Sequence, residues 1–83
     1  MSTLDVPTPD LHRRFGGAVR ERREELRWSQ EALAHRAALN RSYLGEVERG
    51  SVAPSLTTME KIARALDVRL SDLLMRCENA QSA

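Results

Sequence analysis

The sequence predicts an all-α protein, one compact domain of five short helices. Apolar residues recur at spacings of three and four along most of the chain, which places them on one face of a helix. Ser29, Asn40 and Ser55 each stand just before such a segment, and serine and asparagine are favoured helix N-caps. No segment alternates apolar and polar residues as a strand would. With three aromatic residues among 83, the core must be mostly aliphatic, which suits small packed helices.

The composition excludes several classes of protein. Cys77 is the only cysteine, so an intramolecular disulfide and a metal site of several cysteines are excluded, and a reducing cytoplasm is expected. His12 and His35 are too far apart in sequence to suggest a zinc site. No apolar run approaches the ~20 residues of a membrane span, and the N-terminus lacks the basic start of a signal peptide. Clustered carboxylates and nucleophile–base pairs are also missing, so we expect no enzyme, no metal and no cofactor.

The charge is balanced overall but unevenly distributed. The net charge is +1 at pH 7. The first ten residues carry two acids, residues 11–49 carry nine arginines and six acids, and residues 50–83 carry four charges of each sign. The positive excess therefore lies in the middle of the chain, as a weak footprint of nucleic-acid binding. On charge alone, a solvated surface of mixed charge is the preferred interpretation.

The chain divides into three expected segments. A flexible N-terminal arm covers residues 1–9, the folded domain covers residues 10–75, and a polar tail that frays covers residues 76–83. Asp10 can N-cap a first helix that runs to about Arg27. The apolar stripe of this helix consists of Leu11, Phe15, Ala18, Val19 and Leu26.

The next two helices carry clear start and stop signals. Ser29 begins the second helix, and Trp28 and Leu33 have the spacing of a hydrophobic staple around it. Asn40 begins the third helix, and Gly50 can end it in the left-handed conformation. About three residues separate the two helices, so they must cross at a steep angle, which is the geometry of a helix-turn-helix.

Two further helices complete the domain. Pro54 breaks the chain and Ser55 caps the fourth helix. The apolar residues of the fourth helix are Leu56, Met59, Ile62, Ala63 and Leu66. The last helix is short and contains Leu70, Leu73 and Leu74, and we expect Cys77 to be an incidental thiol in the tail beyond it.

The stretch "SQEALAHRAALNRSYLGEVERG" resembles the helix-turn-helix of the Cro/phage-repressor-like (Xre-type) family of DNA-binding regulators. The resemblance continues through "PSLTTMEKIARALDVRLSDLL" and covers roughly residues 12–75. It implies a lambda-repressor-like DNA-binding domain that binds duplex DNA and regulates transcription. The run "RSYLGEVERG" narrows the resemblance to the controller proteins of restriction–modification systems.

The resemblance assigns roles to individual residues. The positions that match base-reading residues are Arg41, Ser42 and Glu46. The positions that match contacts to phosphates or a flanking base are Gln30, Asn40, Tyr43, Arg49 and Ser51. Arg23 and Glu48 match a pair that forms a structural salt bridge. The family usually has glycine in the turn where this chain has Ala38, and a left-handed alanine costs roughly 1 kcal/mol.

Several of these residues have ordinary structural alternatives. Arg41 could be one more surface arginine, and Glu46 could form an exposed ion pair with Arg41 or Arg49, worth under about 1 kcal/mol. The ring of Tyr43 could pack on the fourth helix. Gly45 interrupts the third helix, and we expect it to lie in the middle of the docking face, where it lets the helix approach DNA closely.

The last helix predicts self-association. DNA readers of this kind usually bind near-palindromic sites as two-fold dimers. We therefore expect a homodimer through an apolar patch of Leu70, Leu73, Leu74 and Met75. RNA polymerase is a further candidate partner, and no small-molecule ligand is expected. The alternative function is a protein-binding module, such as a toxin-neutralising antitoxin, which would use the same patch.

Overall fold

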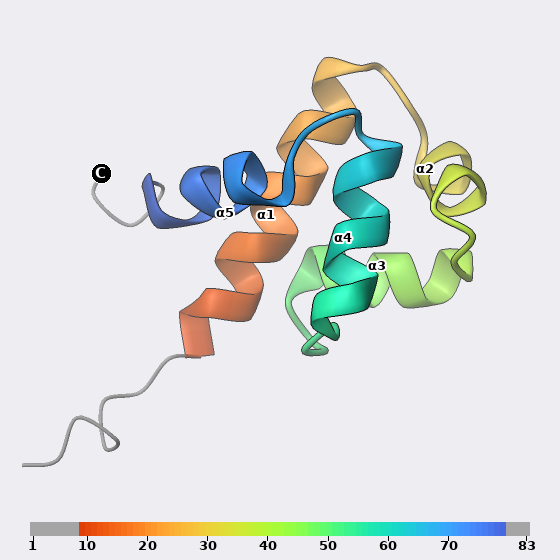
Figure 1. The fold of residues 1–83 in the computed structure, drawn as a ribbon. Helices are drawn as coiled ribbons and strands as arrows, with labels where there is room; N and C mark the ends of the chain where they lie inside the picture. The colour runs from red at the N-terminus through yellow and green to blue at the C-terminus, as the bar shows by residue number, and fades with distance from the viewer. Residues whose placement is uncertain (1–8, 80–83) are drawn as a thin grey trace, which may run out of the picture.

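The computed structural model describes residues 9–79, and this part of the chain contains five helices and no strand (Figure 1). The helices are α1 (Pro9–Glu25), α2 (Gln30–Arg36), α3 (Arg41–Arg49), α4 (Leu56–Ala65) and α5 (Leu70–Asn79). The predicted all-α class is confirmed. None of the helices that the structure describes is long and apolar enough to cross a membrane.

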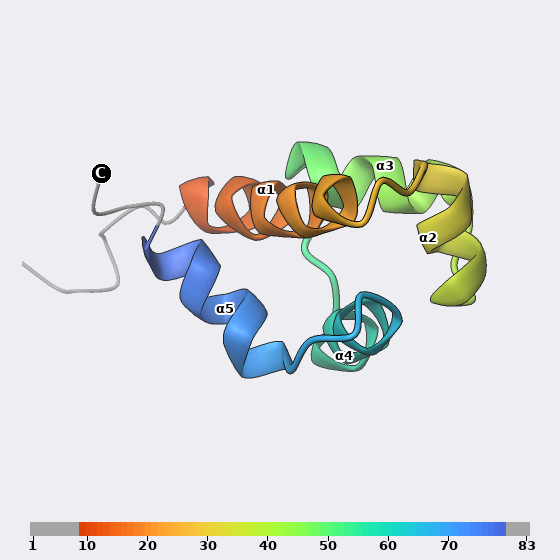
Figure 2. The same ribbon diagram turned by 90° about the horizontal axis from the view of Figure 1, so that it is seen from above.

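The five helices surround one small core. Helix α1 packs against α3 and α5, and α2 packs against α3 and α4. Figure 2 shows α1 and α3 on one side of the molecule and α4 and α5 on the other, with α2 at one end. The largest fully buried side chains are Val19, Leu33, Leu44, Val47, Ile62, Leu66, Leu73 and Cys77. The core is mostly aliphatic, as the scarcity of aromatic residues predicts, and Phe15 is the buried aromatic side chain within it.

Helix α1 differs from the prediction at both ends. It begins at Pro9, so Asp10 is not the N-cap but an acidic residue in the first turn. Proline is tolerated in a first turn because the N–H that it lacks has no intrahelical acceptor there, and a carboxylate is stabilised beside the positive end of the helix. The helix ends at Glu25, two residues before the predicted end. Residues 1–8 of the predicted arm lie outside the described part of the chain.

Helix α5 extends further than predicted. It continues to Asn79, so residues 76–79 are helical, and only residues 80–83 of the predicted tail lie outside the described residues. Cys77 is 1% exposed and belongs to the core, which contradicts its assignment to a frayed tail. It follows Leu73 by four positions and so falls on the same buried stripe. Burial raises the pKa of the Cys77 thiol.

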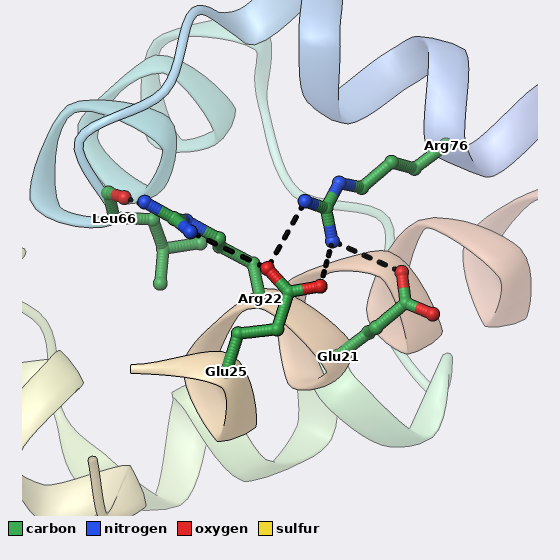
Figure 3. Close-up of polar contacts among 5 residues, drawn as sticks. All are labelled: Glu21, Arg22, Glu25, Leu66 and Arg76. Atoms are coloured by element: carbon green, nitrogen blue, oxygen red, sulfur yellow. Dashed lines mark hydrogen bonds and ion pairs between the residues drawn. The ribbon is translucent and has the colours of Figure 1, made fainter. Parts of the chain in front are cut away.

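A network of charged side chains joins α5 to α1 (Figure 3). The Arg76 guanidinium donates from Nη1 to Glu21 Oε1 at 3.0 Å and to Glu25 Oε2 at 2.9 Å. On the other side of Glu25, the Nε of Arg22 donates to the Leu66 carbonyl at 3.1 Å. The hydrogen bond from Arg76 holds the pKa of Glu25 below its ordinary value. Because that pKa is lowered on folding, the network contributes stability at neutral pH and loses it in acid, as Glu25 is protonated.

Four helices end in the same left-handed turn, but only one of these turns uses glycine. Gly50 has φ 76° after α3, whereas Arg27, Ala38 and Asp67 have φ 60°, 55° and 59° after α1, α2 and α4. After α2, the Ala38 N–H donates to His35 O at 3.2 Å and the next N–H donates to Ala34 O at 2.8 Å. These two bonds are those of a Schellman motif. The conformation predicted to be costly at Ala38 is therefore present.

We expect Ala38→Gly to raise the free energy of unfolding by about 0.5–1 kcal/mol. Glycine relieves the left-handed strain but loses more chain entropy on folding, so the net gain is smaller than the strain itself. Urea denaturation followed by circular dichroism measures the change. Ala32→Gly, inside α2, is the matched control and should destabilise the protein, because glycine lowers helix propensity there. Equal effects of the two substitutions would contradict strain at Ala38.

Candidate nucleic-acid interface

Helices α2 and α3 form a helix-turn-helix whose start signals follow the sequence prediction. The side chain of Asn40 accepts from the backbone N–H of Ser42 at 2.8 Å and of Tyr43 at 3.3 Å. Ser29 caps α2 through Ala32 N at 3.0 Å in the same way. The Asn40 oxygen is therefore occupied by the cap, while its amide N–H groups can still donate to an outside partner.

Helix α3 has one buried side and one exposed side. Its buried residues are Leu44, Gly45, Val47 and Glu48. Its exposed or half-buried residues are Arg41, Ser42, Tyr43, Glu46 and Arg49. The predicted inward residues Leu44 and Val47 are confirmed, but Gly45 and Glu48 join them. The helix thus presents a polar surface with Arg41 at its start and Arg49 at its end.

Gly45 does not lie in the open face of α3, contrary to the prediction. A Cβ at this position would lie 3.2 Å from Arg49 Nη1 and 3.9 Å from Gln30 Oε1. The glycine therefore makes room for side chains of the protein itself. The error arose because position 45 lies on the border between the two faces, and only the tertiary position of α2 decides which side covers it.

Arg41 and Glu46 do not pair with each other. Arg41 Nε lies 4.0 Å from Glu31 Oε1, and the two side chains are 60% and 79% exposed. An exposed pair of this kind contributes under about 1 kcal/mol, so the guanidinium can be redirected easily. Within residues 9–79 the Glu46 carboxylate forms no ion pair. The exposed pair with Arg41 or Arg49, its structural alternative, is therefore absent from the described residues.

The aromatic residues near the interface sit at the edge of the core. Tyr43 and Trp28 are half-buried and pack against the core cluster. The Arg36 guanidinium lies over the Trp28 ring at 4.2 Å from its centroid. Tyr43 therefore packs on the core and stays partly exposed, while its predicted alternative, packing on the fourth helix, stays a prediction.

A buried network holds α3 against α1 and α2. Arg23 and Glu48 form a bidentate pair, with Nε–Oε2 at 2.7 Å and Nη2–Oε1 at 2.9 Å. Their side chains are only 11% and 3% exposed. The third guanidinium nitrogen donates to the Trp28 carbonyl at 2.9 Å, and Gln30 Nε2 donates to Glu48 Oε1 at 2.9 Å. The hydrogen bond to Glu48 raises the pKa of Arg23.

This network includes one contact that sequence reasoning missed. The resemblance predicted the pair of Arg23 and Glu48, and the structure forms it. It gave Gln30 only a phosphate contact, whereas one amide hydrogen of Gln30 is bound to Glu48. Eighteen residues separate Gln30 from Glu48, and no local pattern in the sequence links them.

Ser51 is also engaged within the protein. Its hydroxyl donates to the Glu46 carbonyl at 3.1 Å, and its backbone N–H donates to the same oxygen at 3.0 Å. Both bonds close the C-terminus of α3. A hydroxyl has a single hydrogen, so a contact from Ser51 to a phosphate requires the hydroxyl to rotate away from Glu46.

Comparison with known proteins agrees with this geometry. A family model described as helix-turn-helix matches residues 19–73, which is more than half of the chain. The chain belongs to the helix-turn-helix family. The restriction-modification controller protein C.AhdI from Aeromonas hydrophila shares 44% identity with this helix-turn-helix chain at a TM-score of 0.74, over 80% of this chain and 98% of that one.

Curated relatives point the same way. Control protein C.BamHI of Bacillus amyloliquefaciens is 41% identical over 68 residues, covering 81% of this chain and 84% of the relative. The immunity repressor protein of Bacillus phage phi105 is 39% identical over 59 residues, which span 71% of this chain but 41% of the repressor. The resemblance to Xre-type regulators is confirmed. These relatives make up a family of DNA-binding regulators rather than of enzymes, and the antitoxin alternative is not favoured.

The apolar patch predicted on the last helix of this helix-turn-helix protein is smaller than expected. Leu73 is fully buried in the core of a single chain, so its assignment to a dimer interface is wrong. Leu70 is half-buried, and only Leu74 and Met75 are exposed, at 36% and 58%. The buried residues of α5 are Leu73 and Cys77, one turn apart, and positions 74 and 75 follow Leu73 around the helix toward its exposed side.

Proposed function

We propose that this chain is a transcriptional regulator that binds a near-palindromic duplex DNA sequence as a homodimer, in the manner of a restriction–modification controller. The main support is α3, which is capped at both ends, pinned by the buried Arg23–Glu48 pair, and polar on its outer side. It would act in the cytoplasm, at the nucleoid, with RNA polymerase as a candidate partner. Control would come from protein concentration through dimerisation, without a small-molecule ligand or a catalytic step.

The start of α3 would read base edges in the major groove. Arg41 and Ser42 occupy its first two positions and are exposed. Arginine recognises guanine through two parallel hydrogen bonds to O6 and N7. Glu46, one turn after Ser42, can accept from a cytosine amino group. The Glu46 carboxylate forms no ion pair within the described residues, which supports its role as an acceptor for a base.

Replacing Arg41 tests base readout directly. We expect Arg41→Ala to cost about 1–3 kcal/mol of binding free energy and to relax specificity at one base pair in each half-site. Its stability should hardly change, because the side chain is 60% exposed. Fluorescence anisotropy with single-base variants of the operator distinguishes a contact to a base from a contact to the DNA backbone. An equal loss on every variant would make Arg41 a backbone contact.

Five residues around α3 would set its register on the DNA backbone. They are Gln30, Asn40, Tyr43, Arg49 and Ser51. Asn40 keeps its amide donors free of the cap, and Gln30 keeps one of its two amide hydrogens. Arg49 is exposed at the end of α3. Ser51 would contact a phosphate only after its hydroxyl leaves the Glu46 carbonyl.

The dimer would form through the outer side of α5. Leu74 and Met75 supply the exposed apolar side chains, with the half-buried Leu70 beside them. Arg76 pairs with Glu21 and Glu25 of α1 (Figure 3). These pairs hold α5 against α1 and would therefore set the direction in which the patch points. Two copies related by a two-fold axis would place their α3 helices about one helical turn of DNA apart.

Selection of bound sequences from a random duplex pool tests the proposal. We expect a near-palindrome whose half-site centres are separated by about 10 base pairs. A palindrome would support both DNA binding and dimer symmetry. Failure to enrich any sequence would overturn the proposed function, and an asymmetric site would overturn the homodimer.

A further inference from the structure

A polar pocket opens where α1, α2 and α3 meet. It has a volume of about 370 Å³ and is lined by Arg20, Arg23, Gln30, Glu48 and Arg49. Arg23 and Glu48 neutralise each other within it. Two guanidinium groups therefore remain, from Arg20 in α1 and Arg49 in α3, and the pocket carries an excess of positive charge.

These two arginines are available to an outside partner. Within residues 9–79, Arg49 forms no ion pair. Arg20 Nε pairs with Glu24 at 3.2 Å, but the two side chains are 64% and 57% exposed. Such a pair contributes under about 1 kcal/mol and leaves the other guanidinium N–H groups unused. Arg49 also belongs to the exposed side of α3, so the pocket adjoins the proposed reading surface.

Gly45 decides where the Arg49 guanidinium lies. The 3.2 Å between Arg49 Nη1 and the position of a Cβ at residue 45 shows that the side chain folds back over α3 by one turn. There it approaches α2, because Gln30 lies 3.9–4.0 Å from the same point. A long side chain at position 45 would fill this space and push the guanidinium out of the pocket. The glycine costs about 1 kcal/mol of helix propensity, and seating Arg49 is a physical reason to keep it.

We propose that this pocket binds one phosphate of the DNA backbone, with Arg20 and Arg49 as its ligands and Gly45 as the positioning residue that seats Arg49. The inference rests on the proposed DNA-binding function and adds Arg20 and Gly45 to it. Guanidinium groups bind phosphate oxygens through paired, charge-assisted hydrogen bonds. A phosphate held from α1 and α3 at once would fix the angle at which α3 enters the groove, since backbone contacts set orientation.

The salt dependence of duplex binding tests the pocket. The slope of log affinity against log salt changes by about 0.9 for each phosphate contact on B-DNA. With the selected operator and fluorescence anisotropy, we expect Arg20→Ala and Arg49→Ala each to make the slope shallower, by at most about 1 because they share one phosphate, and to weaken all sequences equally. Arg20→Lys should keep most of the slope. Arg64→Ala is the control, because Arg64 is exposed on α4 and lines other pockets.

The outcomes distinguish a failure of the proposed phosphate pocket from a failure of the proposed DNA-binding function. Wild-type protein that binds no duplex would overturn the proposed function. Wild-type protein that binds with a steep slope, while Arg20→Ala behaves like Arg64→Ala, would overturn the pocket alone. Replacing chloride by inorganic phosphate at constant ionic strength distinguishes a site for a phosphate of the DNA backbone from a site for free phosphate ions. Unchanged affinity is expected for a backbone site, and competition at millimolar phosphate would indicate a site for free anions instead.

A double-variant cycle tests the role of Gly45. We expect Gly45→Leu to weaken binding about as much as Arg49→Ala, and the double variant to be no weaker than either single variant, because both changes remove the same guanidinium from the pocket. Gly45→Ala should keep the wild-type slope, since Arg49 needs to move by only a few tenths of an ångström. Additive losses would show that position 45 acts independently of Arg49 and would overturn its positioning role.

Discussion

Gly16→Ala should destabilise the protein by about 3 kcal/mol or more. Gly16 is buried where α1 crosses the end of α3. A Cβ at this position would lie 2.5 Å from the carbonyl oxygen of Glu48 and closer still to that of Val47. Both atoms belong to the backbone of α3, so no side chain can turn aside, and the helices must separate. Overpacking of a tight core costs about 1–3 kcal/mol and more where the backbone has to shift.

Gly17→Ala is the matched control for that substitution. Gly17 is the next residue of the same helix, it is exposed, and a Cβ there would meet nothing within 4 Å. Alanine should therefore stabilise the protein by about 0.5–1 kcal/mol through helix propensity alone. Chemical denaturation of both variants measures the contrast. If Gly16→Ala were as stable as Gly17→Ala, the close approach of α1 and α3 would be wrong.

The local signals of this fold could be predicted from the sequence, because their partners lie within three residues. Ser29, Asn40 and Ser55 cap their helices through N–H groups two or three positions away. Gly50 ends α3 in the left-handed conformation, as expected. The left-handed turns at Arg27 and Asp67 were not predicted, because neither residue carries the glycine signal that marks such a turn.

The candidate site was predicted only in part, because its contacts join residues that are far apart in the chain. The resemblance supplied Arg23 and Glu48, but the third member of their network, Gln30, depends on how α2 lies against α3. The position of Gly45 under Arg49 depends on the same contact. Leu73 and Leu74 are adjacent and equally apolar, and only the packing of α5 on α1 and α4 decides which one is buried.

Glu48→Gln should cost about 3–5 kcal/mol of folding stability, the usual result of breaking a buried pair on one side. Each oxygen of Glu48 accepts from Arg23, and one of them also accepts from Gln30. Glutamine has nearly the same shape, but its NH₂ group places a donor against donors and leaves the guanidinium without a counter-charge. Because α1, α2 and α3 meet at this network, we also expect weaker DNA binding, by misplacement of α3 rather than by loss of a DNA contact.

A double-variant cycle separates the charge from the packing of this pair. Arg23→Met removes the other partner and should also be strongly destabilising, since it leaves Glu48 buried without its cation. Glu48→Leu is the second single variant of the cycle, and combining it with Arg23→Met removes both charges, so the double variant should lose much less than the sum of the two single losses. Urea denaturation of all four proteins measures the coupling. Additive losses, or single losses below about 1 kcal/mol, would mean that the pair is solvated and does not hold α3 in place.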